Sequence, residues 1–560
     1  MSLDTLRRRL AIPKTSIQLC LLGIAAGLIA AILIILFRLT IHFFQGLFLE
    51  SADNFTTLSE VNRVILPVMA ALFIAVFADM TGFKHYRLGI PFVIHRIKHH
   101  YGQMPIWNTA NQFFGGAFAL ICGFSVGREG PSVHMGATGA SILAERLHLP
   151  LNAARTLGGC GVAAGIAASF NTPLAAVIFV MEVVLREYKV HIFVPIMLAA
   201  VTGALLTQNV FGTDSELALI SITPLSGWHY PFLVLCGVVL GAIAFAFNQN
   251  LMLIIKTFKP LNMFPRLLLA GLIAGGIGYL VPEAMGSGMS AITQALQSPH
   301  DVQLLTTILI AKLLATLFAI GLGIPGGLIG PVIGLGVVMG TLMSFFGQFI
   351  SPGVDVSGTY GVLGMAGLLA ATLHAPLAAL TAVMELTSSP QIIVPAMLVI
   401  STAYVTALQV FGNRSIFLQQ LDFQGLPYQV SPATEALQKV GIMAEMEENF
   451  KLMYTEDKEQ IKATLSAVNS QTPLIVYDEQ NGYRLAEYDL SLTGESGVNI
   501  SYIPLHGLSN QATLADAFEL LKDKRSGAVY VYNRKDKQQI MGILRWDQLR
   551  HILTIRHTLL

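Results

Sequence analysis

The sequence predicts an all-α membrane domain built from two repeats, followed by a small α/β domain. The first observation is the uneven charge: 36 Asp, Glu, Lys and Arg residues lie in the first 430 positions and 31 in the last 130. The second is that residues 16–37 and 313–354 carry no charge at all. A helix needs roughly 20 apolar residues to cross the hydrocarbon layer. A multi-pass membrane body with a soluble tail accounts for both observations.

The third observation is an internal duplication. Residues 161–183 (GVAAGIAASFNTPLAAVIFVMEV) align with residues 364–386 (GMAGLLAATLHAPLAALTAVMEL), with 11 identities in 23 positions that include Pro173 with Pro376 and Glu182 with Glu385. The glycines and the proline of GFSVGREGPSVHMG, which starts at Gly123, recur 200 residues later in GIPGGLIGPVIGLG. Chance similarity between Ala- and Gly-rich helices does not explain shared Gly, Pro and Glu positions in one order. Duplicated membrane domains are typical of transporters.

Both repeats contain a glycine-rich break, GREGP at 127–131 and GIPGGLIGP at 323–331. Irregular backbone at membrane depth is tolerated where it is buried or lines a polar cavity. A helix that starts there presents unpaired amides and the positive end of its dipole. Two such helix starts predict an anion site without a dedicated cation. The alternative is that the glycines only permit close helix packing.

Glu129 is the candidate gate. It lies within GREGP, and a carboxylate at bilayer depth indicates function by default. When ionised it can occupy the positive helix ends and exclude the permeant anion, and when protonated it leaves. The alternative interpretation is an ion pair with the neighbouring Arg128. Lys312, in an apolar run, is expected to snorkel or to pair at a helix end, with no transport role.

These motifs resemble the CLC family of chloride channels and chloride/proton exchangers. GREGP matches the family motif, LGIP at 88–91 resembles its GSGIP, and GGLIGP at 326–331 resembles its GGxFxP. The resemblance implies a homodimer in a lipid bilayer, with one anion pathway in each subunit and two inverted halves around it. The predicted domains are an N-terminal segment (1–15), a CLC-like membrane domain (16–415, with repeats at about 16–213 and 217–415), a linker (416–435) and a tail (436–560).

The resemblance also implies an anion site, from which this sequence departs at four positions. Leu88 replaces the serine of GSGIP, Ile329 the phenylalanine of GGxFxP, and Phe417 the tyrosine that closes the inner side. Val183 stands where exchangers often carry an inner acid on the proton pathway, which starts at Glu129. The predicted anion-binding residues are Leu88, Gly89, Ile90, Arg128, Glu129, Gly130, Gly327, Leu328, Ile329 and Phe417.

The tail shows short apolar strands at 474–477 and 528–532 and helical spacing over 513–522. The repeated order of elements resembles a pair of CBS modules. In such modules the position of Asp547 binds the ribose of an adenine nucleotide, although the usual upstream Ser or Thr is absent. A dimerising scaffold without a ligand is the alternative.

We therefore expect transport of chloride or a similar small anion, passive or loosely coupled to protons, with a strictly coupled antiporter as the alternative. An intramembrane enzyme is disfavoured, because the sequence has no HExxH or GxGD motif. The cluster of His and basic residues at 95–100 fits a cytoplasmic basic loop better than a metal site. We expect no nucleic-acid partner, no metal and no required cofactor. The expected location is the bacterial inner membrane, with both termini in the cytoplasm.

Overall fold

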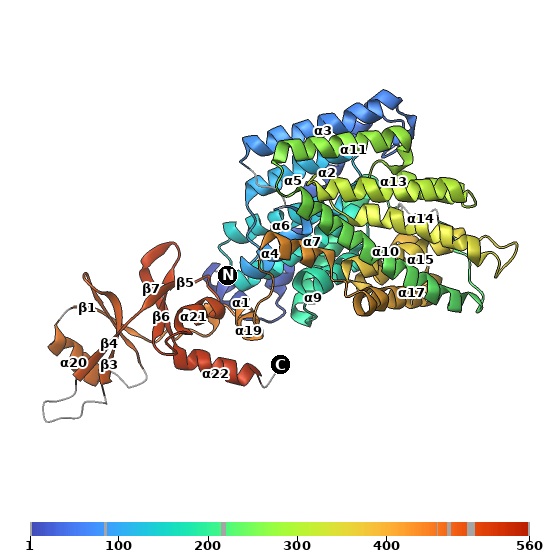
Figure 1. Cartoon of the computed structure of the whole chain (residues 1–560). Helices are drawn as coiled ribbons and strands as arrows, with labels where there is room; N and C mark the ends of the chain where they lie inside the picture. Colours follow the sequence, from blue (N-terminus) through green and yellow to red (C-terminus); the bar gives the residue numbers. More distant parts are fainter. Residues whose placement is uncertain are drawn as a thin grey trace. The chain divides into compact units, whose positions relative to one another are not determined.

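The structure is a computed structural model that describes residues 3–82, 87–213, 220–455, 457–467, 472–489 and 499–557. The chain forms two compact units. The membrane unit comprises Cys20–Leu143 and Arg155–Tyr428, and the tail unit comprises Met1–Leu19, Ala144–Ala154 and Gln429–Leu560. Figure 1 shows the helices of the first and the mixed helices and strands of the second.

The membrane unit is all-helical, as predicted. Its first half contains α2 (Ile17–Gln45), α3 (Glu60–Met80), α4 (Gly89–His99), α5 (Ile106–Ile121), α6 (Glu129–Arg146), α7 (Leu151–Phe170), α8 (Pro173–Phe179) and α9 (Val190–Phe211), with a π-helical segment at Val180–Leu185. Its second half contains α10 (His229–Phe258), α11 (Met263–Leu280), α12 (Met289–Gln297), α13 (Val302–Gly321), α14 (Ile329–Gly347), α15 (Ser357–Leu373), α16 (Pro376–Thr387), α17 (Ile393–Val405) and α18 (Ile416–Gln424), with a π-helical segment at Thr406–Val410.

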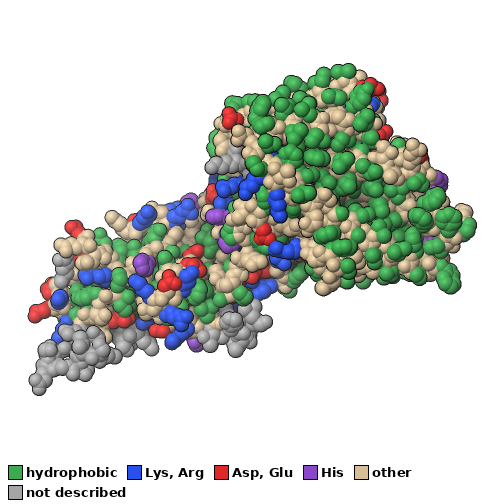
Figure 2. Space-filling model, viewed as in Figure 1, with side chains coloured by type: hydrophobic (Ala, Val, Ile, Leu, Met, Phe, Trp, Pro, Cys, Tyr) green, Lys and Arg blue, Asp and Glu red, His purple; other side chains and the backbone are tan. Residues whose placement is uncertain are grey.

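The outer surface of this unit is apolar. Among the described residues, eight helical segments are long and apolar enough to cross a membrane. On α2, the side chains of Leu21, Ile32 and Leu36 are 60%, 58% and 54% exposed. Figure 2 shows hydrophobic side chains covering the visible face of the membrane unit, whereas charged side chains gather over the tail unit. Exposed apolar faces of this extent belong against lipid, because water would penalise them. The chain is thus a multi-pass integral membrane protein.

Repeat-related glycines bring the central helices into contact. A Cβ added at Gly161 would lie 2.1 Å from the carbonyl oxygen of Gly136, which joins α7 to α6. At the equivalent contact between α15 and α14, a Cβ added at Gly364 would lie 2.2 Å from the carbonyl oxygen of Gly336. Only a residue without a side chain permits these backbones to approach so closely. The duplication seen in the sequence therefore produces two matching helix pairs.

Each half also caps a helix of the other half. The carboxylate of Glu182 accepts hydrogen bonds from the backbone N–H groups of Leu377 and Ala378, at 3.3 and 2.8 Å. Glu385 does the same for Leu174 and Ala175, at 2.9 and 2.8 Å. The helices concerned, α16 and α8, both begin at a proline and have unpaired amides in their first turn. The two glutamates thus hold equivalent structural places, as their alignment indicated.

The tail unit contains two copies of a β-α-β-β motif. The first is β1 (Lys451–Tyr454), α20 (Lys458–Ala467), β2 (Leu474–Asp478) and β3 (Gly482–Asp489), and the second is β5 (His506–Ser509), α21 (Leu514–Leu521), β6 (Ala528–Asn533) and β7 (Asp536–Arg545). In each copy the first two strands are parallel and the next pair is antiparallel, and β4 (Asn499–Pro504) completes the first sheet. The expected strands and helix are confirmed as β2, β6 and α21, and α19 (Pro432–Gln438) and α22 (Trp546–His557) flank the motifs.

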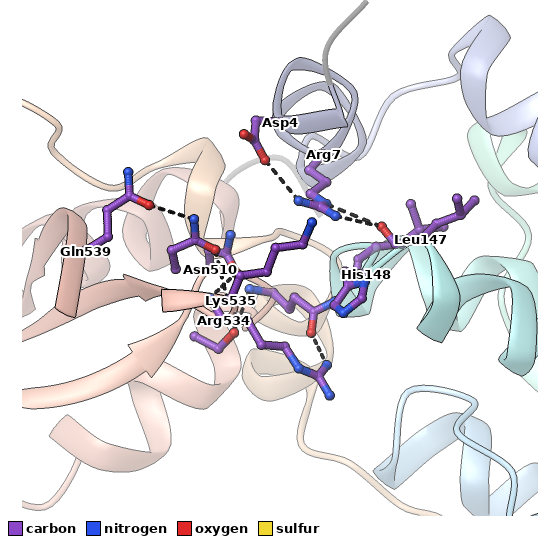
Figure 3. A network of polar contacts seen from close by, with 12 residues as sticks. Asp4, Arg7, Leu147, His148, Asn510, Arg534, Lys535 and Gln539 are labelled. Atoms are coloured by element: carbon purple, nitrogen blue, oxygen red, sulfur yellow. Dashed lines mark hydrogen bonds and ion pairs between the residues drawn. The ribbon is translucent and has the colours of Figure 1, made fainter. Parts of the chain in front are cut away.

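The tail unit also includes α1 (Leu3–Ala11) and residues 144–154 (Figure 3). Arg7 pairs with Asp4 at 2.9 Å and donates to the carbonyl oxygen of Leu147 at 3.0 Å. Gln511 donates its side-chain amide to Leu149 O at 2.9 Å. The compact units therefore do not follow the predicted boundaries. The N-terminal segment joins the tail, and α18, within the predicted linker, belongs to the membrane unit.

Candidate anion-binding site

The two glycine-rich breaks meet at the centre of the membrane unit. Gly127 and Gly327 form an antiparallel bridge in which each N–H donates to the other's carbonyl oxygen at 2.7 Å. Directly after this bridge, α6 begins at Glu129 and α14 begins at Ile329. Because the two segments run in opposite directions, the positive ends of two helices converge at the junction of the inverted halves.

The third predicted motif joins them. The N-cap of α4 is Leu88, and this helix begins at Gly89, which has a φ of +67° that favours glycine. A cavity of about 70 Å³ lies between this helix start and the breaks. Of the predicted anion-binding residues, its lining includes Leu88, Gly89, Ile90, Gly130, Gly327, Leu328 and Phe417. The structure therefore brings residues from three separate motifs to one small cavity.

Glu129 lies beside this cavity and is fully buried. Its Oε1 accepts hydrogen bonds from the backbone amides of Ile329 and Gly330, the latter at 3.2 Å. These are first-turn amides of α14 without intrahelical partners, so the carboxylate occupies a position that suits an anion. Gly127 and Gly327 make room for it, because a Cβ at either would lie 2.0 or 2.2 Å from a Glu129 carboxylate oxygen.

Arg128, the neighbour of Glu129, contacts an aromatic ring. Its guanidinium carbon lies 5.0 Å from the centre of the Phe170 ring, a cation–π contact. Arg128 also lines a larger cavity of about 430 Å³, together with Asp53 and Ser287. Asp53 is held there by Ser287, whose N–H and hydroxyl donate to it at 3.0 and 2.7 Å. Two hydrogen bonds of the Glu129 carboxylate come from the backbone of α14.

A third cavity, of about 290 Å³, also includes Phe417 in its wall. Its lining includes Glu182, Val183, Arg186, His374 and Phe417. Phe417 lines both this cavity and the 70 Å³ cavity. Val183 is buried there and brings no ionisable group to the wall.

Gln112 and Lys312 occupy repeat-equivalent positions, and each hydrogen-bonds to the backbone at or just before the first residue of a helix, α4 for Gln112 and α12 for Lys312. They are 200 residues apart, the same offset as the two breaks. Gln112 Oε1 accepts a hydrogen bond from Gly89 N at 2.8 Å. Lys312 is fully buried, and its ammonium group donates to the carbonyl oxygens of Ala284, Met285 and Gly286. Of the two expectations for Lys312, snorkelling is wrong, because the side chain is buried, whereas its carbonyl partners lie at the end of the 3₁₀ helix Pro282–Ala284, as pairing at a helix end requires. The motif search missed Gln112, although the 200-residue offset from Lys312 could have identified it.

The histidine cluster lies on a helix, so the expected loop is wrong. The apolar positions of 89–97 face the core, and α4 continues to His99. His95 lies 2.8 Å from the carbonyl oxygen of Pro427 through its Nδ1. Within the described ranges no group of three His, Cys, Asp or Glu residues has the geometry of a metal site. In the tail, Asp547 lies in the first turn of α22, 82% exposed and 3.4 Å from Arg550.

Helix starts that converge on a buried carboxylate, inside a multi-pass membrane unit, define a class of anion-transport protein. The family model described as voltage gated chloride channel matches residues 82–408, more than half of the chain. The chain belongs to this family, the CLC channels and transporters, and it therefore transports anions.

The chain is also similar to individual proteins and solved structures of this family. The chain is 34% identical over 314 residues to a "Putative chloride channel protein ClcB-like" of Ralstonia nicotianae, covering 54% of this chain and 72% of the relative. It is 27% identical over 444 residues to the "H(+)/Cl(-) exchange transporter ClcA" of Vibrio vulnificus, covering 75% and 92%. Its fold is similar to that of a slow cyanobacterial Cl-/H+ antiporter (TM-score 0.64, 22% identity, 72% and 97% covered) and of a eukaryotic CLC transporter (0.60, 20%, 98% and 99%).

Proposed function

We propose that this protein moves chloride across the membrane through a pathway gated by Glu129. The observation that carries the proposal is that the Glu129 carboxylate accepts hydrogen bonds from the backbone amides of Ile329 and Gly330. We call the position between these amides the carboxylate seat. An ionised carboxylate in that seat competes with a permeant anion for the same donors. When it is protonated it loses its charge and leaves the seat to the anion. Flux should therefore rise as the pH falls.

Chloride would bind at the backbone amides around 127–130 and 328–329. The cavity of about 70 Å³ beside them is large enough for one dehydrated monatomic anion. Leu88 and Phe417 in its wall carry no hydrogen-bond donor in their side chains. Backbone amides and helix ends would thus supply most of the attraction for the ion.

The coupling to protons is proposed to be absent or loose. A proton that reloads Glu129 from the 290 Å³ cavity finds no acid at Val183. Glu182 is held in place by two amides of α16, which fits a structural role better than a relay. The second candidate is a strictly coupled antiporter. It is favoured by the name of the Vibrio relative, a proton/chloride exchange transporter that this chain matches over 92% of its length.

The test is an imposed chloride gradient across sealed proteoliposomes, with chloride flux and external pH recorded together. Robust chloride flux without proton movement supports the passive proposal, and Val183→Glu then shows whether one carboxyl group installs coupling. Uphill proton movement at a fixed stoichiometry supports the antiporter instead.

Glu129→Gln tests the gate in the same assay. The neutral carboxamide mimics the protonated acid, so flux should increase and lose most of its pH dependence. A variant that folds normally, yet is as slow and as pH-sensitive as the parent protein, contradicts the gate.

We further propose that the protein is a homodimer with one pathway in each subunit, an arrangement that family membership supports. Light scattering of the detergent-solubilised protein tests it directly, and a monomer with full flux contradicts it. For the tail, titration with an adenine nucleotide distinguishes a ligand-binding module from a scaffold, with Asp547→Ala as the comparison.

A further inference from the structure

The 70 Å³ cavity contains a polar side chain that lies outside the motifs. Gln420 lies on α18, one helical turn after Phe417, and lines the cavity together with Leu88 and Leu328. It is only 9% exposed. Within the described part of the chain its carboxamide makes no hydrogen bond with another residue. A carboxamide that lines a cavity without a protein partner keeps its two N–H donors available to whatever occupies that cavity.

Three backbone donors near the cavity are already engaged. The N–H of Gly89 donates to Gln112. The amides of Ile329 and Gly330 donate to Glu129. Leu88 and Phe417 present only carbon atoms at the two places where the family's pattern has hydroxyl groups. Gln420, and Gln424 one turn further along α18, therefore bring side-chain N–H donors to a wall at which Leu88 and Phe417 supply none; of the two, Gln420 is the more buried.

We infer that Gln420 donates a carboxamide N–H to the anion in this cavity and takes over the role of the two absent hydroxyl groups. The inference rests on the proposed chloride pathway and names a residue that determines its affinity. A monatomic anion suits this position for two reasons. The positive starts of α4 and α14 point to the cavity, and no acidic residue lines it. A carboxamide can turn its NH₂ group toward such an ion, because rotation about its last torsion has a low barrier.

A glutamine donor has a consequence for mechanism. Its side chain extends from α18, whose residues Phe417 and Leu418 also line the 290 Å³ cavity. The donor and the Phe417 ring, which lines both cavities, therefore lie on one short helix. A shift of α18 would change anion affinity and the walls of both cavities together, whereas a donor on α4 would not be tied to Phe417.

The experiment measures chloride affinity by calorimetry and chloride flux in proteoliposomes on the full-length protein. Gln420→Met keeps the length of the side chain and removes both donors. Because a hydrogen bond to a charged group is lost, chloride should bind about tenfold more weakly or worse. Gln420→Glu places a carboxylate in the cavity and should abolish chloride binding at neutral pH. Gln303→Met, the same change at an exposed position on α13, is the matched control and should behave like the parent protein.

A merely structural role would lower thermal stability in chloride-free buffer. The inference predicts instead that this stability is unchanged and that the extra stabilisation by added chloride is lost, because stabilisation by a ligand follows its affinity. If Gln420→Met does not fold, Gln420→Asn decides. This variant keeps the amide and draws it back by one methylene, so weakened chloride binding supports the inference and unchanged binding overturns it.

Failure of the inference and failure of the proposed function give different results. If Gln420→Met binds and transports chloride like the parent protein, while Glu129→Gln still raises flux, the inference is overturned. The Gln420 carboxamide then hydrogen-bonds to water and not to the anion. If the parent protein itself neither binds nor transports chloride, the proposed function fails first.

Discussion

The two halves of the membrane unit start their central helices from the same backbone and with different side chains. Gly127 and Gly327 exchange equal hydrogen bonds of 2.7 Å, and a helix begins two residues after each of them. In the first half that position is Glu129, and in the second it is Ile329. The first half thus supplies the carboxylate and the second supplies the amides that hold it.

Other repeat-related positions remained symmetric. Glu182 and Glu385 cap helices of the opposite half through the same pair of contacts. Gly161 and Gly364 permit the same close helix approach. The duplication therefore supplies the scaffold, whereas function arises where the two copies differ.

The largest effect on this asymmetry is expected from a variant that keeps Glu129 but fills the space its carboxylate occupies. For Gly127→Ala, the three atoms nearest to the new Cβ all belong to the Glu129 side chain, the nearest at 2.0 Å. The carboxylate must therefore move out. We expect chloride flux at neutral pH to rise to about the level of Glu129→Gln, with little pH dependence left.

Gly327→Ala is the paired variant. Its Cβ would also meet the backbone nitrogen of Gly130 at 2.7 Å, so the start of α6 must shift as well. We expect a loss of about 1–3 kcal/mol in the free energy of unfolding, as for other overpacked sites. Equal stability and equal flux in both variants would show that the two glycines are interchangeable after all.

The anion cavity offers the next largest effect. Leu88→Ser and Phe417→Tyr each add a hydroxyl donor to its wall, and together they should tighten chloride binding by roughly tenfold, since the new bonds are to a charged partner. Calorimetry on the single and double variants measures this. No change, or weaker binding, in the double variant would contradict a chloride site between these two residues.

Glu182 and Glu385 test the symmetric part of the scaffold. Glu182→Gln and Glu385→Gln each leave one capping amide without its oxygen, which costs about 1–3 kcal/mol of unfolding free energy. We expect similar losses from both variants in thermal unfolding, with the exposed Glu50→Gln as a neutral control. Loss of proton movement in Glu182→Gln alone would instead show that this residue relays protons.

Removal of the tail should have the smallest effect on transport. A chain that ends at Pro432 keeps every residue of the anion cavity, so its selectivity should match that of the full-length protein. Its stability should fall, because contacts such as Gly441 N to Ala11 O at 2.9 Å are lost. A purified core that binds no chloride would contradict this modularity.

Several parts of the site were within reach of the sequence. Glu129 stood out because a carboxylate in a glycine-rich break at membrane depth is costly without a function. The 200-residue offset identified the second break. Gln420 was not found, because a lone glutamine in an apolar helix has no spacing that marks it as part of a site, whereas Gln112 could have been found from its 200-residue offset to Lys312. The α1 helix was assigned to a separate segment, since its contacts with residues 144–154 join positions far apart in the chain.

The membrane class, the duplication, the family motifs and the order of elements in the tail could all be predicted from the sequence. These depend on composition and local periodicity, which are properties of neighbouring residues. The contacts of Glu129 with the amides of Ile329 and Gly330, and the position of Gln420 in the same cavity as Leu88, became known only from the fold. The sequence does not mark these backbone donors, because every residue except proline carries a backbone N–H. An anion site made from such groups is therefore defined by where helix ends converge, and the sequence does not specify that convergence locally.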